Sequence, residues 1–145
     1  MIEKLEFYHG AAVVRIIEDD RCRSISKTEH GYLVNGDILV FLKYTTKAHS
    51  PWRFTVVKDD LDRLENPGVA IARCVVGFVC GGDGICSVPL QGLTRLLGDA
   101  SGWIAVKRAF SGCYSVMGPL GKIARKIPLN DWPVVLFEEP RTNGR

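Results

Sequence analysis

The amino-acid sequence predicts a mixed α/β (α+β) fold in a single globular domain. Three observations favour this class: an amphipathic segment near the N-terminus, an Asn-Gly dipeptide between two β-rich runs, and a long apolar run, VAIARCVVGFVC, in the middle of the chain. A chain of 145 residues is long enough to bury roughly 70% of the surface that its unfolded form exposes. We expect a domain over residues 1–138, with a core at 3–100, a β-rich C-terminal extension at 101–138 and a flexible tail at 139–145.

The first half of the chain predicts a helix followed by a hairpin. Residues 3–18 place apolar side chains at helical spacing, so we expect an amphipathic helix that starts or is interrupted near Gly10. Asn35–Gly36 favours a two-residue hairpin turn, because a type I′ turn needs positive φ at both central residues. Alternation along the second strand of this hairpin puts Phe41 and Lys43 on the same face.

The second half predicts a buried strand between two short helices, and then a β-rich end. We expect Ser50–Pro51 to interrupt pairing, WRFTVV to resume a strand, and KDDLDRLE to form a helix with acids in its first turn. VAIARCVVGFVC is typical of a central strand buried on both faces, and GGDG turns it back into ICSVPL. LQGLTRLLG predicts a helix ended by Gly98, and WIAVKRAF, CYSVMG and KIARKIP predict three short strands.

Composition is that of an ordinary soluble globular protein, with 46% hydrophobic and 24% charged residues. No apolar run approaches the ~20 residues that span a bilayer, and the N-terminus lacks the features of a signal peptide, so we expect a cytoplasmic protein with no membrane partner. The five cysteines are odd in number and irregularly spaced, which indicates reduced thiols. Cys80 and Cys86 flank GGDG, but zinc needs about four ligands and no second pair completes a site, so we expect no metal.

The charged residues form alternating blocks. The net charge is +3, but residues 1–20 carry −3, 21–58 carry +5, 59–66 carry −3 and 101–145 carry +4. Two interpretations stay open. Either the basic blocks form a stripe that binds a polyanion, or acids populate helix faces and bases populate strand ends.

The order of elements over roughly residues 3–88 carries a family resemblance. The first helix bears Glu6, the second hairpin strand ends in Lys43, a basic exit (TTK) follows, and a helix precedes a long apolar strand and a second hairpin. In this order the chain resembles the PD-(D/E)XK, or restriction-endonuclease-like, superfamily, and within it the Holliday junction resolvase type. The resemblance implies a restriction-endonuclease-like core, with Glu6 and Lys43 as catalytic residues. The KYTTK…SPWRF pattern is also similar to one in small bacterial proteins of unassigned function.

The chain departs from the pattern of that superfamily at its acids. The resemblance implies an acid two residues before the lysine, where this chain has Phe41, because a carboxylate and a lysine must converge on one Mg²⁺. Asp37 lies about 20 Å from Lys43 along an extended strand, and Glu29 is the nearest candidate for the acid of the first strand. We therefore expect a degenerate form whose cleavage is lost or weak. If the protein is an enzyme, it is a metal-dependent nuclease and needs Mg²⁺; otherwise we expect no cofactor.

The basic stretch KYTTKAHSPWRF predicts a surface that binds nucleic acid. Its lysines and arginine can neutralise phosphates, its threonines can bind phosphate oxygens, and an exposed Trp52 could stack on a base. Alternatively, Trp52 and Phe54 fill the core and the lysines are solvated strand ends. The expected nucleic-acid-binding residues are Lys43, Thr45, Thr46, Lys47, Trp52, Arg53, Lys107, Arg108, Lys122, Arg125 and Lys126.

Two functions therefore compete at the level of sequence. The first is a nucleic-acid-binding protein with a degenerate nuclease-like fold. The second is a non-catalytic module for protein interaction or oligomerisation, with a homodimer formed through the C-terminal segment from Asp131 to Phe137. Bases that converge around Lys43 would favour the first function, whereas an exposed apolar patch of Trp132, Val134, Leu136 and Phe137 would favour the second.

Overall fold

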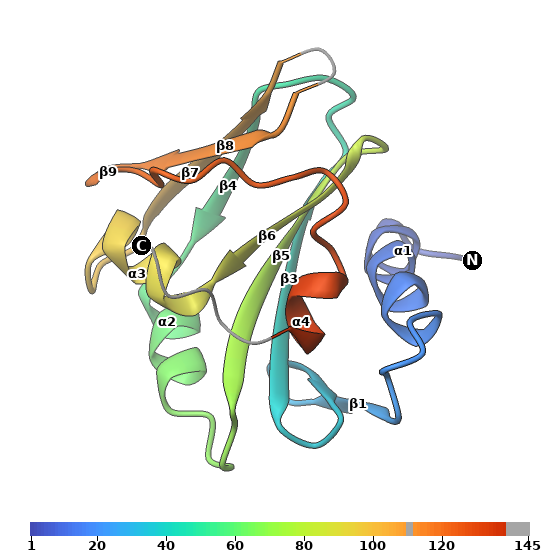
Figure 1. Ribbon diagram of the computed structural model, residues 1–145. Coiled ribbons are helices and arrows are strands. Elements are labelled where there is room, and N and C mark those ends of the chain that lie inside the picture. Colours follow the sequence, from blue (N-terminus) through green and yellow to red (C-terminus); the bar gives the residue numbers. More distant parts are fainter. Residues whose placement is uncertain (110–111, 139–145) are drawn as a thin grey trace.

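The computed structural model describes residues 1–109 and 112–138, and the tail expected at 139–145 lies outside the described residues. Within the described residues the protein has a mixed α+β fold, as the sequence predicts, with four helices and two sheets (Figure 1). The elements are, in chain order, α1 (Lys4–Ile17), β1 (Ile25–Thr28), β2 (Gly31–Val34), β3 (Ile38–Thr45), β4 (Trp52–Val56), α2 (Lys58–Glu65), β5 (Arg73–Cys80), β6 (Gly84–Pro89), α3 (Leu90–Leu97), β7 (Gly102–Arg108), β8 (Tyr114–Gly118), β9 (Gly121–Lys122) and α4 (Val134–Phe137).

The strands form two separate sheets. The first sheet has five strands in the order β1-β2-β3-β5-β6, and the second sheet has four strands in the order β4-β7-β8-β9. The pair β3 and β5 is parallel, and all other pairs of named strands are antiparallel. The strands after residue 100 thus pair with β4, which comes from the middle of the chain.

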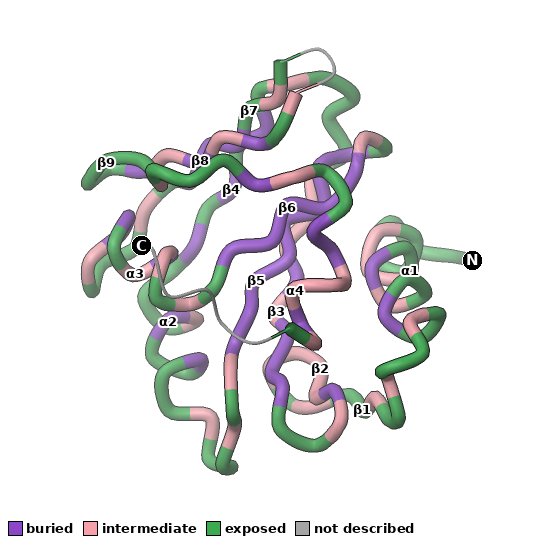
Figure 2. The backbone as a smooth tube through the Cα atoms, viewed as in Figure 1, coloured by how far each residue is buried: buried purple, intermediate pink, exposed green. Residues whose placement is uncertain are grey.

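Strand β5 is the centre of the fold and is buried along nearly its whole length (Figure 2). Its side chains alternate between two hydrophobic clusters. Val75 and Val79 belong to the cluster with α1 and α4, while Val76 and Phe78 belong to the cluster with the second sheet, α2 and α3. A strand covered on both faces must be apolar at every position, which explains the apolar run in the sequence.

The C-terminal segment covers one face of the first sheet together with α1. Trp132 is 2% exposed and Leu136 is 0% exposed, so these two residues do not form the exposed apolar patch that would favour an interaction module. The indole N–H of Trp132 donates to the carbonyl oxygen of Ala12 in α1, at 3.2 Å. Gly77 of β5 makes room for this ring, because a Cβ there would lie 2.9 Å from Trp132 and from Leu42. The segment is therefore part of the core.

The second sheet, α2 and α3 cover the other face of the first sheet. Trp52 and Phe54 of β4 point into this core, whereas Arg53 between them is exposed. Trp52 is 2% exposed, and its indole N–H donates to the carbonyl oxygen of Lys47 at 3.0 Å. The expectation of an exposed Trp52 that stacks on a base is therefore wrong, because alternation along β4 turns this ring inward.

The hairpin predicted at Asn35–Gly36 forms, but with a longer connection. Both residues have positive φ, 54° and 78°, as expected. The register pairs Val34 with Ile38, so three residues rather than two connect the strands. The third residue, Asp37, lies outside the ladder, and its carbonyl oxygen accepts a hydrogen bond from the amide of Ala72 just before β5, at 2.7 Å. The third residue of the connection therefore bonds through its carbonyl oxygen to the segment that leads into β5.

Two further elements differ from the predictions. Helix α1 continues through Gly10 without a break, because the burial of Ala12 and Ile16 outweighs the roughly 0.5–1 kcal/mol that a helical glycine costs. The segment KIARKIP forms only the end of β9 and one bridge between Ile127 and Tyr114. The predicted turn between β3 and β4 at Ser50–Pro51 is confirmed.

We predict that Gly77→Ala destabilises the protein, because the added methyl group would press on Trp132 and Leu42 in a packed core. Overpacking of this kind costs about 1–3 kcal/mol of unfolding free energy. Gly82→Ala is the matched control, since a Cβ at Gly82 meets nothing within 4 Å and the residue is exposed. Urea unfolding of both variants measures the difference. Equal stability of the two variants would show that Trp132 does not pack against Gly77.

Candidate functional site

The second sheet has an inward face and an outward face that differ in chemistry. Inward side chains such as Trp52, Ile104 and Val116 are buried. Side chains at the alternate positions point away from the core. We call them the basic face: Arg53, Thr55, Trp103, Ala105, Lys107, Ser115, Met117 and Lys122.

Strand register aligns the basic face into a row that crosses all four strands. Arg53 lies opposite Ala105, Ala105 opposite Met117, and Met117 opposite Lys122. Neighbouring strands are about 4.8 Å apart, so the backbone positions of Arg53 and Lys122 are roughly 14 Å apart. In the next row, Lys107 lies opposite Ser115. The two residues in the middle of the first row, Ala105 and Met117, carry no charge, so the row is cationic only at its two ends.

The strands that carry this face contain no acidic residue. Residues 38–58 and 100–130, which contain all four strands of the second sheet, include no Asp or Glu. The same two spans contain nine lysines and arginines: Lys43, Lys47, Arg53, Lys58, Lys107, Arg108, Lys122, Arg125 and Lys126. Of these, Lys43 belongs to the first sheet, and Lys58, Arg108 and Arg125 form ion pairs with Asp62, Asp83 and Asp131. The outward side chains of the second sheet thus include Arg53, Lys107 and Lys122, and its strands supply no carboxylate to offset these charges. A surface with this composition presents a positive potential.

An aromatic side chain accompanies the cations. Trp103 is 38% exposed, and the guanidinium of Arg53 lies 5.4 Å from the centroid of its ring. Such a cation–π contact contributes about 0.5–1 kcal/mol at an exposed site and holds the guanidinium near the sheet. The pair offers a positive group and an aromatic edge to the same ligand. Sequence reasoning missed Trp103, although the alternation in GWIAVKR places it on the same side as Lys107.

At one end of the second sheet the surface is hollowed. A depression of about 340 Å³ is lined by Ser50, Lys107, Arg108, Ala109, Gly112, Cys113, Ser115 and Lys126. Here the loop between β3 and β4 meets the end of β7 and the beginning of β8, close to the tip of the β5–β6 hairpin (Figure 1). Three of the predicted nucleic-acid-binding residues, Lys107, Arg108 and Lys126, thus share one site.

Arg108 is held at this site by an ion pair. Its Nε and one terminal nitrogen donate to the two carboxylate oxygens of Asp83, at 2.8 and 2.6 Å, and the hydroxyl of Tyr114 donates to the same carboxylate at 2.9 Å. The hydrogen bonds from Arg108 hold the pKa of Asp83 below its ordinary value of 3.8. Burial, together with the hydrogen bond to Asp83, raises the pKa of Tyr114. Asp83 therefore neutralises Arg108 and fixes its position.

The two catalytic candidates lie on opposite faces of the first sheet. Glu6 belongs to α1, where its carboxylate accepts a hydrogen bond from the amide of Glu3 at 2.9 Å and completes a capping box. Lys43 lies on the other face of β3 together with Phe41, as the alternation predicts. The structure therefore does not bring Glu6 and Lys43 together.

The stretch KYTTKAHSPWRF passes from the first sheet to the second. Lys47 donates its ammonium to the carbonyl oxygen of Pro51 at 2.7 Å, and Thr45 accepts a hydrogen bond from the amide of Lys47 at 3.4 Å. Thr46 is exposed in the loop. Because Lys43 and Arg53 belong to different sheets, the bases of this stretch do not share one surface. Arg53 instead joins residues from β7 and β9, which are far away in the sequence.

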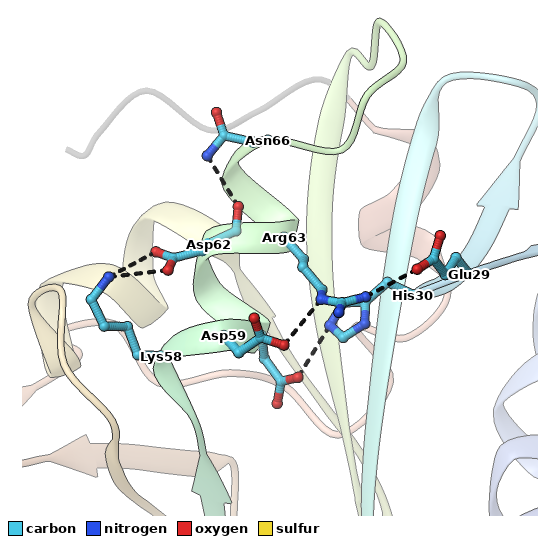
Figure 3. A network of polar contacts seen from close by, with 8 residues as sticks. Glu29, His30, Lys58, Asp59, Asp62, Arg63 and Asn66 are labelled. Atoms are coloured by element: carbon cyan, nitrogen blue, oxygen red, sulfur yellow. Dashed lines mark hydrogen bonds and ion pairs between the residues drawn. The ribbon is translucent and has the colours of Figure 1, made fainter.

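A second polar cluster joins α2 to the turn between β1 and β2 (Figure 3). Arg63 bridges Asp59 and Glu29, at 3.0 and 3.2 Å. His30 stacks on Phe41, and its Nε2 lies 3.2 Å from a carboxylate oxygen of Asp60 without the alignment of a hydrogen bond. A depression of about 240 Å³ lies here, but its three nearby carboxylates repel an anion. The ion pairs hold α2 against the turn between β1 and β2. The nearby carboxylates make this depression unsuitable for a phosphate.

Comparisons with protein-family models, with curated proteins and with solved structures found no match for this chain. In the described residues, no three His, Cys, Asp or Glu side chains lie close enough together to hold a metal ion. None of the helices over the same residues has the length and apolar character needed to cross a membrane.

We predict that Asp83→Asn lowers the unfolding free energy at pH 7 by about 1–3 kcal/mol, the usual worth of hydrogen bonds to a charged group. The pKa of Asp83 is lower in the folded protein than its ordinary value of 3.8, so the stabilisation is present above pH 3.8 and is lost as the pH falls below it. Urea unfolding at pH 7 and pH 3 should therefore show a smaller difference between wild type and variant at pH 3.

The exposed Asp20 supplies the control, since Asp20→Asn should change stability little at either pH. A difference between wild type and Asp83→Asn that stays constant from pH 7 to pH 3 would contradict the role of the ionised carboxylate.

Proposed function

We propose that this protein binds nucleic acid through the basic face of the second sheet. The observation that carries the proposal is the row from Arg53 to Lys122, built on four strands whose sequences contain no acid. Cations that meet phosphates release condensed counterions, which supplies most of the sequence-independent affinity for nucleic acid. The exposed Trp103 and the hydroxyls of Thr55 and Ser115 add groups that bind bases and phosphate oxygens.

The spacing of the cations suits a polyanion. The distance of roughly 14 Å between the two ends of the row is several times the axial rise of about 3.4 Å per phosphate of one strand of B-form DNA, so the two cations can meet different phosphates. A small ligand would reach only one of the two cations, whereas a strand laid across the sheet would reach both. Four of the carboxylates, those of Asp59, Asp60, Asp62 and Glu65, belong to α2 and not to the second sheet.

The proposal includes a degenerate nuclease-like core and a cytoplasmic location. The order of α1, the hairpin strands, α2 and β5 supports the nuclease-like core. The placement of Glu6 and Lys43 on opposite faces of the first sheet supports loss of cleavage. Five free cysteines support the cytoplasmic location. Burial raises the pKa of Cys74 and Cys80 to about 12, which keeps these two side chains protonated. The dimer expected through residues 131–137 is not part of the proposal, since Trp132 and Leu136 are buried.

Binding is tested with the double variant Arg53→Ala/Lys122→Ala, which removes the two ends of the cationic row. We expect weaker binding to duplex DNA, with the slope of log affinity against log salt reduced by roughly 1.5–2 units, because each lost phosphate contact accounts for about 0.9 units. The thermal midpoint should change little, because exposed charges contribute little to stability. Fluorescence anisotropy at several salt concentrations measures both affinity and slope.

The control is Lys4→Ala/Arg15→Ala, which makes the same change in net charge on α1. This variant should keep the wild-type slope. If both double variants reduce the slope equally, the effect belongs to net charge and the basic face is not the binding surface.

Hydrolysis is tested separately. We expect no Mg²⁺-dependent cleavage that depends on Lys43, because Glu6 lies on the other face of the sheet and already caps α1. Incubation of labelled duplex, branched and single-stranded substrates with Mg²⁺ measures this. Rapid cleavage that disappears in Lys43→Ala but persists in Lys47→Ala would show that a catalytic site forms around Lys43 after all.

A further inference from the structure

The depression at the end of the second sheet is built differently from the flat basic face. Lys107 lies directly opposite Ser115 in the β7–β8 pair. On the other side of β8, Ile127 bridges Tyr114, which brings the preceding residue, Lys126, next to Ser115. A hydroxyl therefore has a lysine on either side. Side chains on adjacent strands are separated by about 5 Å at Cβ, so two long lysine side chains can converge above the serine.

A second hydroxyl lines the same depression. The oxygen of Ser50 accepts a hydrogen bond from the amide of Arg108 at 3.1 Å. A serine hydroxyl also has a proton to donate, and its use as an acceptor here leaves that proton available for a ligand in the depression. Ser50 comes from the loop between β3 and β4, so two distant parts of the chain contribute hydroxyl groups to one site.

The net charge of the site is set by the Arg108 ion pair. Asp83 neutralises Arg108 through two hydrogen bonds, and Lys107 and Lys126 contribute two further positive charges. A phosphate diester inside a strand carries one negative charge, whereas a phosphomonoester carries about −1.5 to −2 at pH 7. Two ammonium groups and two hydroxyls thus match a terminal phosphate better than an internal one.

The shape of the site agrees with an end group. Its volume of about 340 Å³ is at the lower end of the range for small-molecule sites, near 300 Å³. Part of its wall is held in place, because Arg108 is tied to Asp83 and to the carbonyl oxygen of Gly112, and Asp83 is tied to the buried Tyr114. A prearranged concave site loses little freedom on binding. A strand end can enter such a hollow, whereas a continuous strand lies on the flat face.

We propose that this depression binds the terminal phosphomonoester of a nucleic-acid strand, with Lys107, Lys126, Ser50 and Ser115 as the groups that contact the phosphate oxygens. The proposal rests on the proposed function, since the basic face carries the rest of the strand. Lys107 adjoins both surfaces, whereas Lys126 belongs to the depression alone and Arg53 and Lys122 belong to the face alone. The two proposals can therefore be tested with different variants.

The experiment measures binding of one oligonucleotide in three forms, with a 5′-phosphate, a 3′-phosphate or hydroxyl groups at both ends. Wild-type protein should bind at least one phosphorylated form about tenfold more tightly than the hydroxyl form, the effect of one hydrogen bond between charged groups. Lys126→Ala should remove this preference and change affinity for the hydroxyl form less than about twofold. Lys126→Arg should keep the preference, because it retains the charge and the donors.

Lys4→Ala is the matched control, since it removes one exposed lysine charge from α1 and Lys4 does not line the depression. This variant should keep the tenfold preference. Arg53→Ala/Lys122→Ala should keep it as well, and should weaken binding of all three oligonucleotide forms by the same factor. Inorganic phosphate alone should compete with the phosphorylated form and not with the hydroxyl form. Equal binding of the three forms by wild type, or a preference that survives Lys126→Ala, overturns this proposal. In either case a reduced affinity of Arg53→Ala/Lys122→Ala would still support the proposed function. A double variant without effect overturns the proposed function and with it the path of the strand over the basic face, whereas the preference for a terminal phosphate is judged by Lys126→Ala.

Discussion

Burial of the parallel pair β3 and β5 on both faces is the constraint on which the rest of the structure depends. The backbone amides and carbonyls of this pair bond to each other and to β2 and β6, and the apolar side chains on each face need a cover. One face receives α1 and the C-terminal segment with Trp132, and the other receives α2, α3 and the second sheet. The first cover combines the N-terminal helix with a segment near residue 135, whereas the second combines β4 and α2 from between the two central strands with α3 and the strands that follow it.

The crossing from the first sheet to the second has chemical consequences. Gly81 adopts φ of 55° at the tip of the β5–β6 hairpin, and a Cβ there would lie 2.1 Å from the carbonyl oxygen of Lys47. This close approach places Asp83 beside the ends of β7 and β8, where it binds Arg108 and Tyr114. The same contacts that join the two sheets thus also form the wall of the cationic depression. Packing and the candidate site share one set of residues at this end of the protein.

Distribution of charge follows from the same layering. Helix α2 carries four acids, Asp59, Asp60, Asp62 and Glu65, and two of them pair with Arg63 and His30. The strands of the second sheet contain no acid, and their exposed side chains include Arg53, Lys107 and Lys122. The acidic block at residues 59–66 and the cations of the second sheet therefore lie on different elements of the fold.

Local patterns in the sequence determined the elements themselves. Asn35–Gly36 encodes its turn through the positive φ that both residues tolerate, and the unbroken apolar run encodes a strand buried on both faces. Period-two alternation also placed Phe41 beside Lys43 on one face of β3. These properties depend on steric preferences and on burial within a few residues, so one sequence is enough to predict them.

Only the tertiary structure decided which residues meet. Trp52 and Trp132 could have been exposed, and their burial depends on partners such as Lys47, Gly77 and Ala12 that no local pattern identifies. The candidate site likewise combines β4, β7, β8 and β9 through strand register, which arises from long-range pairing. The sequence by itself determined the supply of bases and the absence of acids in two spans. Their convergence was decided by the second sheet, because hydrogen bonds between distant strands set the positions of their side chains.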